Sequence, residues 1–142
     1  MTMEYQKALL KDSRTLAQMN RRLIVDTRHR NPMNLSQLNR RMRGWLREGY
    51  RAYFFKRDGR VIGYCVFIKQ KDYLYIRQFY IERAERRKGS GREALGWLRR
   101  HAWKRESRLR MDVLVGNRAA IGFWRSAGFK DYCLTMEREG AP

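Results

Sequence analysis

The sequence predicts a mixed α/β fold built as a single domain over residues 1–142. Three observations support this prediction. Apolar residues recur at helical spacing near the start of the chain, β-rich runs flank the hairpin signal Asp58-Gly59, and the glycines Gly89 and Gly91 separate a strand-like run from a helix-like run. With 43% hydrophobic residues, the chain has enough apolar material for one core despite its many charges.

The first third of the chain is predicted to form a short strand and two helices. Residues 5–9 are typical of a strand, and residues 13–28 carry apolar side chains at helical spacing after the capping residue Asp12. Pro32 cannot continue that helix. A second amphipathic helix is predicted from about Ser36 to Gly49, where a glycine is typical of a helix C-terminus.

The middle of the chain is predicted to form three strands. Residues 51–57 and 60–68 lie on either side of Asp58-Gly59 and should pair as an antiparallel hairpin. Residues 73–81 are a third β-rich run that is apolar on both faces, as expected of a central strand.

The last third is predicted to alternate helices and strands. A helix should begin after Gly89, followed by a strand at 109–115, a helix at 117–127 and a final strand at 129–136. The complete predicted order, βααβββαβαβ on one sheet, has no internal repeat and no low-complexity linker.

Charge is the most unusual property of the composition. The chain has 33 Lys and Arg residues against 14 Asp and Glu, a formal net charge of +19 at pH 7. Most of the cations are arginines, which pair bidentately with phosphate and carboxylate groups. The charge is spread along the chain instead of forming a basic tail, which weakens the case for a dedicated nucleic-acid-binding arm. Two interpretations stay open, an anionic partner and a general arginine enrichment of a solvated surface.

The sequence predicts no membrane, metal or disulfide site. It has no run of about 18 apolar residues and its first residues lack the apolar core of a signal peptide, so a cytoplasmic location is predicted. Cys65 and Cys133 lie in strand-like runs without metal-ligand spacing, and both are predicted to be buried free thiols.

The strongest functional signal lies between Ile81 and Leu95. A strand-like run stops, cations follow, and Gly89 and Gly91 open a helix. Glycines let backbone N–H groups approach an anion, and a helix N-terminus adds the positive end of its dipole. This segment therefore predicts a binding site for a phosphorylated ligand.

Two other interpretations fit the same residues. Residues 89–94 match the G-x-G-x-x-A pattern of dinucleotide-binding loops, and Asp112 lies where a ribose-binding acid is expected. Against this, several charged residues separate Ile81 from Gly89, whereas a dinucleotide-binding loop follows its strand at once. The second alternative is a glycine-containing surface turn before an ordinary helix.

Two blocks of the sequence resemble the GNAT-type N-acetyltransferase superfamily, and the resemblance covers essentially the whole chain. The first, RRKGSG from Arg86 to Gly91, is similar to the family's (Arg/Gln)-x-x-Gly-x-(Gly/Ala) pyrophosphate loop. The second, from Asn117 to Phe129, is similar to the family's Asn-led helix and its Gly-Phe closure. Both blocks lie in the family's order, with a helix and a strand between them.

The resemblance implies acetyl-CoA as co-substrate and a set of residues that bind it. The loop from Arg86 would surround the pyrophosphate, the end of the central strand would offer main-chain groups to the pantetheine arm and the thioester, and Asn117 would hydrogen-bond the pantetheine. The implied acetyl-CoA-binding residues are Phe79, Tyr80, Ile81, Arg86, Arg87, Lys88, Gly89, Ser90, Gly91, Arg92, Asn117 and Trp124.

Trp124 departs from the family's pattern. In many members a Tyr at this position protonates the departing thiolate, but an indole has a donor N–H and no accessible acid function. Tyr80 and Tyr132 are candidate replacements as general acid, and water is a further alternative because a thiol is a fair leaving group. No residue is identified as the general base.

The implied function is transfer of an acetyl group from acetyl-CoA to a primary amine by direct attack in a ternary complex. The amine acceptor is unidentified, and the charge leaves an anionic acceptor open. The alternatives are an RNA- or polyanion-binding module, for which no motif is present, and a catalytically silent acyl-CoA-binding protein of the same fold. A monomer and a homodimer are equally compatible with the sequence.

Overall fold

The computed structural model describes residues 2–140 and divides them into two compact units, the first ending at Asp112 and the second beginning at Val113. Within the described residues, the first unit contains a five-stranded sheet in the order β1-β2-β3-β4-β5. Neighbouring strands are antiparallel, except that β4 and β5 are parallel. The strands are Glu4–Lys7 (β1), Arg51–Arg57 (β2), Arg60–Lys69 (β3), Leu74–Ile81 (β4) and Leu109–Arg110 (β5).

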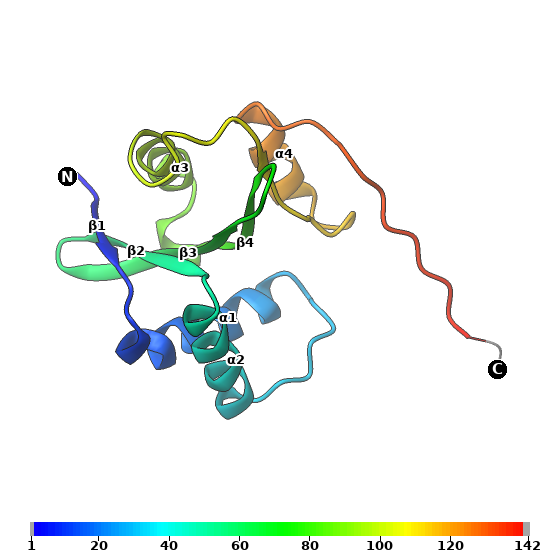
Figure 1. Ribbon diagram of the computed structural model, residues 1–142, viewed down its shortest axis with the longest axis horizontal. Coiled ribbons are helices and arrows are strands. Elements are labelled where there is room, and N and C mark those ends of the chain that lie inside the picture. The colour runs from blue at the N-terminus through cyan, green and yellow to red at the C-terminus, as the bar shows by residue number, and fades with distance from the viewer. Residues whose placement is uncertain (1, 141–142) are drawn as a thin grey trace. The chain divides into compact units, whose positions relative to one another are not determined.

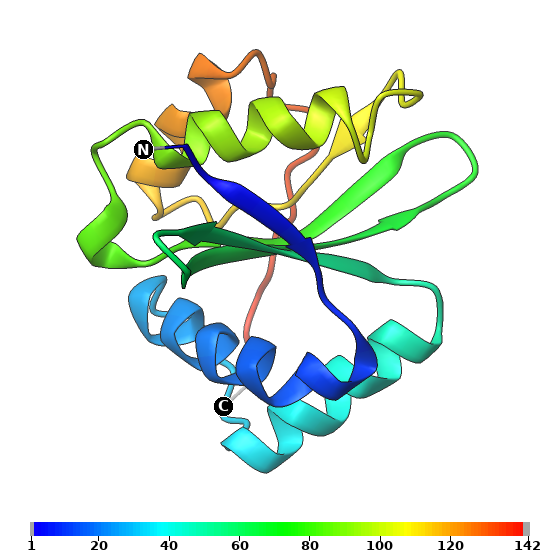
Figure 2. The ribbon, with the colours of Figure 1, turned by 90° about the vertical axis from the view of Figure 1, so that its left-hand side faces the viewer.

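Helices cover both faces of this sheet. Helices α1 (Ser13–Asp26) and α2 (Leu35–Arg47) lie on one face, and α3 (Ser90–Arg100) lies on the other (Figures 1 and 2). Two short 3-10 helices, η1 (Leu10–Asp12) and η2 (Arg83–Glu85), precede α1 and follow β4. The predicted mixed α/β fold is therefore confirmed.

The two faces of the sheet bury different side chains. Under α1 and α2, Met19 and Met42 pack with Tyr64 and Tyr80 in an apolar cluster. The face under α3 is aromatic, where the Trp97 ring stacks on Tyr5 with a centroid distance of 4.2 Å. Burial of such large side chains is the main favourable term for a small domain.

Local sequence signals explain the hairpin and the start of α2. Asp58 and Gly59 both have positive φ, 54° and 76°, as a two-residue type I′ turn requires, and this confirms the predicted β2–β3 hairpin. Asn34 caps α2, because its Oδ1 accepts a hydrogen bond of 2.9 Å from the Gln37 backbone N–H while the Gln37 side chain accepts one from the Asn34 N–H. The helix therefore begins one residue before the predicted Ser36.

The second unit contains helix α4 (Arg118–Ser126), which confirms the predicted helix. The predicted final strand at 129–136 is wrong, because residues 129–140 have no regular secondary structure. Tyr132, Leu134 and Met136 alternate as in a strand, but they are 77%, 64% and 84% exposed. A strand needs a partner for its backbone groups, and none of the described strands pairs with this segment.

The predicted strand at 109–115 is much shorter in the structure. Strand β5 has only Leu109 and Arg110, which pair with Leu74 and Tyr75 of β4. The ladder stops there, and the Asp112 carboxylate accepts a 2.8 Å hydrogen bond from the Tyr75 hydroxyl. Parallel pairing therefore joins β4 only at its first two residues.

Both cysteines are free thiols. Cys65 is buried as predicted, whereas Cys133 is exposed because the strand predicted around it does not form. Among residues 2–140, no helix has the length and apolar character needed to cross a membrane. The same residues contain no group of His, Cys, Asp or Glu side chains that could hold a metal ion.

Gly63 is required where β3 lies against β4. A Cβ at this position would be 2.3 Å from the Tyr80 carbonyl oxygen and 2.9 Å from the Phe55 ring. We expect Gly63→Ala to lower the free energy of unfolding by about 1–3 kcal/mol, because backbone atoms must move to accommodate the methyl group. Urea denaturation measures the change.

Gly44→Ala in α2 is the matched control, since a Cβ there meets no atom within 4 Å. This substitution should stabilise the protein by about 0.5–1 kcal/mol through helix propensity. Equal effects of the two substitutions would contradict the close approach of β3 and β4.

Candidate functional site

The segment between β4 and α3 ends in a helix N-terminus with open backbone donors. Gly89 precedes α3 in the left-handed conformation with φ 78°, and Arg87 also has a positive φ of 61°. Within the described residues, the N–H groups of Gly89, Ser90 and Gly91 form no hydrogen bond. A Cβ added at Gly89 would meet nothing within 4 Å. Open donors, a helix dipole and free space together favour an anion at this point.

Arg57 holds the base of this segment from strand β2. Its Nη1 donates a 3.1 Å hydrogen bond to Ser90 Oγ and lies 3.3 Å from Glu85, and its Nη2 lies 3.5 Å from Glu93. Ser90 is 1% exposed. The Ser90 side chain is therefore engaged inside the protein, and its predicted contribution to ligand binding would come from its backbone N–H.

Arg86 fixes the segment from the opposite side. Its Nε donates a 2.8 Å hydrogen bond to the Ile81 carbonyl oxygen, its Nη2 pairs with the Asp26 carboxylate at the end of α1, and its guanidinium lies 5.5 Å from the centre of the Tyr80 ring. Arg83 donates a second hydrogen bond of 2.8 Å to Asp26. The Arg86 side chain is thus committed to protein groups, and it positions the segment.

The Asp26 carboxylate is held in its charged form by these two arginines. Burial raises its pKa, but hydrogen bonds from Arg83 and Arg86 and their charges outweigh burial, so the net pKa is below the ordinary 3.8. A depressed pKa in the folded state contributes stability at pH values above 3.8. That contribution is lost as the pH falls through the lower, folded-state pKa.

Besides Arg83 and Arg86, three further cations of the same segment are exposed to solvent. They are Arg87, Lys88 and Arg92. Lys88 has only a distant carboxylate contact, with 3.9 Å between its Nζ and Glu85. These charges surround the open N-terminus of α3 in sequence, so the electrostatics of the segment favour a polyanion such as a pyrophosphate.

Strand β4 has an open edge that leads to this segment. Because β5 pairs only with Leu74 and Tyr75, the parallel ladder between these two strands does not extend along the stretch from Ile76 to Ile81. The predicted main-chain contacts of Phe79, Tyr80 and Ile81 lie on this stretch. An extended ligand can therefore bind to backbone groups of β4 as an added strand does.

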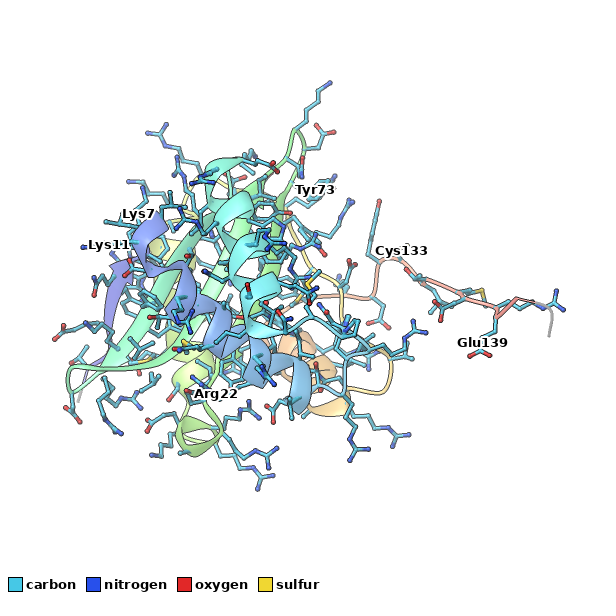
Figure 3. All side chains as sticks on the ribbon, turned by 90° about the horizontal axis from the view of Figure 1, so that it is seen from below. Lys7, Lys11, Arg22, Tyr73, Cys133 and Glu139 are labelled. Atoms are coloured by element: carbon cyan, nitrogen blue, oxygen red, sulfur yellow. The ribbon has the colours of Figure 1, made fainter. Side chains whose placement is uncertain are left out.

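Tyr80 is buried and its hydroxyl has a defined partner. The hydroxyl donates a 2.7 Å hydrogen bond to Glu82 Oε1, and Arg22 of α1 (Figure 3) binds the same carboxylate through Nε at 3.0 Å and Nη2 at 2.8 Å. Burial, followed by the hydrogen bond to Glu82, raises the pKa of Tyr80 to about 12. The phenol proton is held by Glu82, which makes Tyr80 a weak acid for a thiolate.

The remaining predicted site residues belong to the second unit. Asn117 caps α4, with its Oδ1 accepting a 3.2 Å hydrogen bond from the Ala120 N–H. Trp124 is 6% exposed, and its ring centroid lies 5.0 Å from that of Phe129. Tyr132 is 77% exposed. The functional roles of Asn117, Trp124 and Tyr132 stay predictions.

Sequence reasoning did not find the residues that support the site. Asp26, Arg57, Arg22 and Glu82 hold the segment between β4 and α3 or its neighbour Tyr80. Arg57 is 33 residues from Ser90, and Arg86 is 60 residues from Asp26. One sequence contains no local pattern that could have identified pairs so far apart.

The family profile described as acetyltransferase (GNAT) family matches residues 16–129. The match includes most of α1, all of α2, strands β2 to β5, the segment between β4 and α3, α3 itself and α4. The chain therefore belongs to the acetyltransferase (GNAT) family.

Solved structures with the same fold cover nearly the whole chain. A possible acetyltransferase from Clostridium difficile 630 has a TM-score of 0.77 at 16% identity, covering 100% of this chain and 99% of its own. A protein described as a predicted acetyltransferase, with acetyl-CoA, from Clostridium acetobutylicum has a TM-score of 0.73 at 20% identity, covering 97% of this chain and 96% of its own. The ribosomal-protein-alanine N-acetyltransferase from Brucella melitensis biovar Abortus 2308 has a TM-score of 0.76 at 14% identity, covering 97% and 100%. No curated protein sequence matches this chain.

Asp26→Asn should loosen the segment between β4 and α3. An asparagine side chain keeps the shape but cannot form two charge-assisted hydrogen bonds with Arg83 and Arg86. We expect exchange of the hydrogen-bonded amides of Glu82, Glu85 and Arg86 to become about tenfold faster, while the strands of the sheet keep their protection.

The control is Asp131→Asn, which removes an exposed ion pair with Arg125 in the second unit. It should leave exchange of these three amides unchanged. Unchanged exchange in folded Asp26→Asn as well would show that Arg86 does not position the segment.

Proposed function

We propose that this protein is an acetyl-CoA-dependent N-acetyltransferase that acetylates a primary amine by direct attack in a ternary complex. The observation that carries the proposal is the open N-terminus of α3, which follows the part of β4 beyond its ladder with β5 after the short 3-10 helix η2, in a chain of the GNAT family. The N-terminus of α3 suits a pyrophosphate, and the edge of β4 suits an extended pantetheine arm.

Several structures of the same fold have matching ligands or names. The Clostridium acetobutylicum protein is with acetyl-CoA, and an aminoglycoside acetyltransferase from an uncultured soil metagenomic sample is in complex with sisomicin. The Brucella protein is named as an N-acetyltransferase of ribosomal-protein alanine. These proteins support acetyl transfer to an amine as the class of reaction, and they differ too much from one another to suggest a common acceptor.

The residues around α3 have separate roles in this proposal. The N–H groups of Gly89, Ser90 and Gly91, with the neighbouring donors of Arg87, Lys88 and Arg92, would hold the pyrophosphate. Arg86 would keep the segment in place through Asp26 and the Ile81 carbonyl oxygen. The backbone of Phe79 to Ile81 would position the pantetheine arm and orient the thioester carbonyl.

Acetyl-CoA supplies an activated acetyl group as a thioester. In the transfer, the neutral amine forms a new C–N bond to the acetyl carbon, the C–S bond breaks with its electron pair on sulfur, and the amine loses one proton to solvent water. Positioning by the chain provides most of the rate gain in this proposal. Water is the proposed proton donor to the thiolate, because the Tyr80 proton is held by Glu82; Tyr132 stays an alternative.

Trp124 also favours a second candidate, a protein that binds acyl-CoA without turnover. A Tyr at this position would supply a phenol as acid, whereas an indole supplies none. Apart from this residue, the two candidates predict the same acetyl-CoA site. For either one we propose a cytoplasmic protein, as a monomer or a homodimer.

The test measures release of free CoA thiol in the presence of a panel of amines that includes polyamines, aminoglycosides, amino acids and peptide N-termini. An enzyme releases thiol in an amine-dependent way, whereas a silent acyl-CoA-binding protein binds acetyl-CoA in calorimetry without release. A protein that neither binds acetyl-CoA nor releases thiol would contradict both candidates.

Gly89→Glu should weaken acetyl-CoA binding by about tenfold to a hundredfold. The substitution adds a negative charge at the helix N-terminus and strains a residue with φ 78°. Gly49→Glu is the control, because Gly49 also has a positive φ, 103°, and lies at the other end of strand β2 from Arg57. If both variants bind acetyl-CoA with equal affinity, the segment that contains Gly89 does not bind the pyrophosphate.

A further inference from the structure

Two arginines from different elements flank one indole on the face of the sheet that α1 and α2 cover. The guanidinium carbon of Arg41, in α2, lies 4.5 Å from the centre of the Trp45 ring, and that of Arg77, in β4, lies 4.8 Å from it. Figure 3 views the protein from this side, where many basic side chains surround the two helices. We call Arg41, Trp45 and Arg77 the arginine pair site.

A β-bulge in β4 explains why Arg77 points to this face. Val66 of β3 is opposite Gln78, but the next residue, Phe67, is opposite Ile76, so Arg77 is the extra residue. Gln78 accepts a 2.8 Å hydrogen bond from the Tyr64 hydroxyl on the side of α1 and α2. In a regular strand, Arg77 would point to the opposite side from Gln78. The bulge turns both residues toward the same face, as bulges near functional sites often do.

The two positive charges have no carboxylate partner. Neither Arg41 nor Arg77 forms an ion pair within residues 2–140. Arg41 Nη2 donates a 3.1 Å hydrogen bond to the buried Asn20 side chain, but its Nε is buried without a hydrogen-bond partner. Burial, and then the charge of Arg77, lowers the pKa of Arg41. A bound anion would offset both the unpartnered burial of Arg41 and the repulsion between the two guanidiniums.

This arrangement differs from that of the arginines near α3. There, Arg86 pairs with Asp26 and Arg57 with Glu85, although the chain has more than twice as many basic as acidic residues. A general arginine enrichment of the surface does not account for two cations brought to one indole by a bulge. The position of both guanidiniums beside Trp45 therefore favours an anion at the arginine pair site.

An open hollow adjoins the site at the start of α2. Met33, Gln37, Arg40 and Arg41 line it, and its volume is about 330 Å³. Arg41 belongs to both the hollow and the arginine pair site. A hollow of this size suits a group as large as an amino acid or the end of a peptide, with an apolar wall at Met33 and cations beside it.

We propose that Arg41 and Arg77 bind the carboxylate of the amine acceptor, so that the acceptor is an amino acid or a short peptide that carries a carboxylate. This inference rests on the proposed acetyl transfer. Arg77 lies two residues before Phe79, where the main-chain contacts to acetyl-CoA are proposed to begin, and two strand residues span roughly 7 Å. An acceptor whose amine and carboxylate are several bonds apart matches this separation.

The test compares 5-aminopentanoate with 5-aminopentanamide, which has the same length and a neutral amide in place of the carboxylate. Binding of each to the protein saturated with CoA is measured by calorimetry, and acetyl transfer is followed by thiol release from acetyl-CoA. The wild type should prefer the carboxylate about tenfold or more in binding and in kcat/KM.

Arg77→Gln and Arg41→Gln should lower this preference to near unity while binding of acetyl-CoA and of the neutral amide stays unchanged. Arg77 is exposed, so its variant should fold even if Arg41→Gln does not. Arg47→Gln is the control, because it removes the same charge from the exposed last turn of α2 and should keep the wild-type preference.

The two proposals fail in different ways. A wild type without carboxylate preference, or an Arg77→Gln variant that keeps it, overturns the arginine pair site. Carboxylate-dependent binding that Arg77→Gln abolishes, without thiol release from any acceptor, supports the anion site and contradicts the acetyl transfer.

Discussion

Arginine–carboxylate pairing fixes the segment between β4 and α3, and the candidate site depends on that constraint. Asp26 holds Arg83 and Arg86 from the end of α1, while Arg57 connects β2 to Glu85 and to the first turn of α3. The Arg57 and Glu85 side chains are only 17% and 11% exposed. Partly buried pairs of this kind add little net stability, because desolvation offsets their attraction, but they define one geometry. Here that geometry leaves the N-terminus of α3 open.

The distribution of charge matters more for function than its total. Most of the ion pairs among the described residues of the first unit use its scarce carboxylates to hold arginines in place, and two groups of cations outside these pairs matter for the proposals. One lies at the start of α3, where open N–H groups and exposed cations favour a pyrophosphate. The other is the pair of Arg41 and Arg77 on the opposite face of the sheet, where a bulge brings two guanidiniums to Trp45. Strand β4 connects them, since the part of it beyond the ladder with β5 includes Arg77 and ends at Ile81, where the segment that leads to α3 begins.

Short sequence patterns predicted the features of the fold that depend on neighbouring residues alone. Asp58-Gly59 predicted the hairpin, because its turn needs two residues with positive φ. Gly89 predicted the start of α3, and this residue also has a positive φ. The predicted strand at 129–136 failed because alternation of apolar residues cannot supply a pairing partner. The sequence also could not predict the roles of residues that act through contacts with residues far away in the chain. Nothing near Arg86 indicates Asp26, and the bulge at Arg77 is defined only by the register with β3.

The central claim is that the segment between β4 and α3, which contains Gly89, binds the pyrophosphate of acetyl-CoA with the N-terminus of α3. Comparing the affinities of the wild-type protein for acetyl-CoA and for acetylpantetheine, which ends before the phosphates, tests it most directly. If the segment provides several charge-assisted hydrogen bonds, acetyl-CoA should bind at least about a hundredfold more tightly at low salt, with the difference shrinking as salt is added. Equal affinities for the two compounds at low salt would contradict the account.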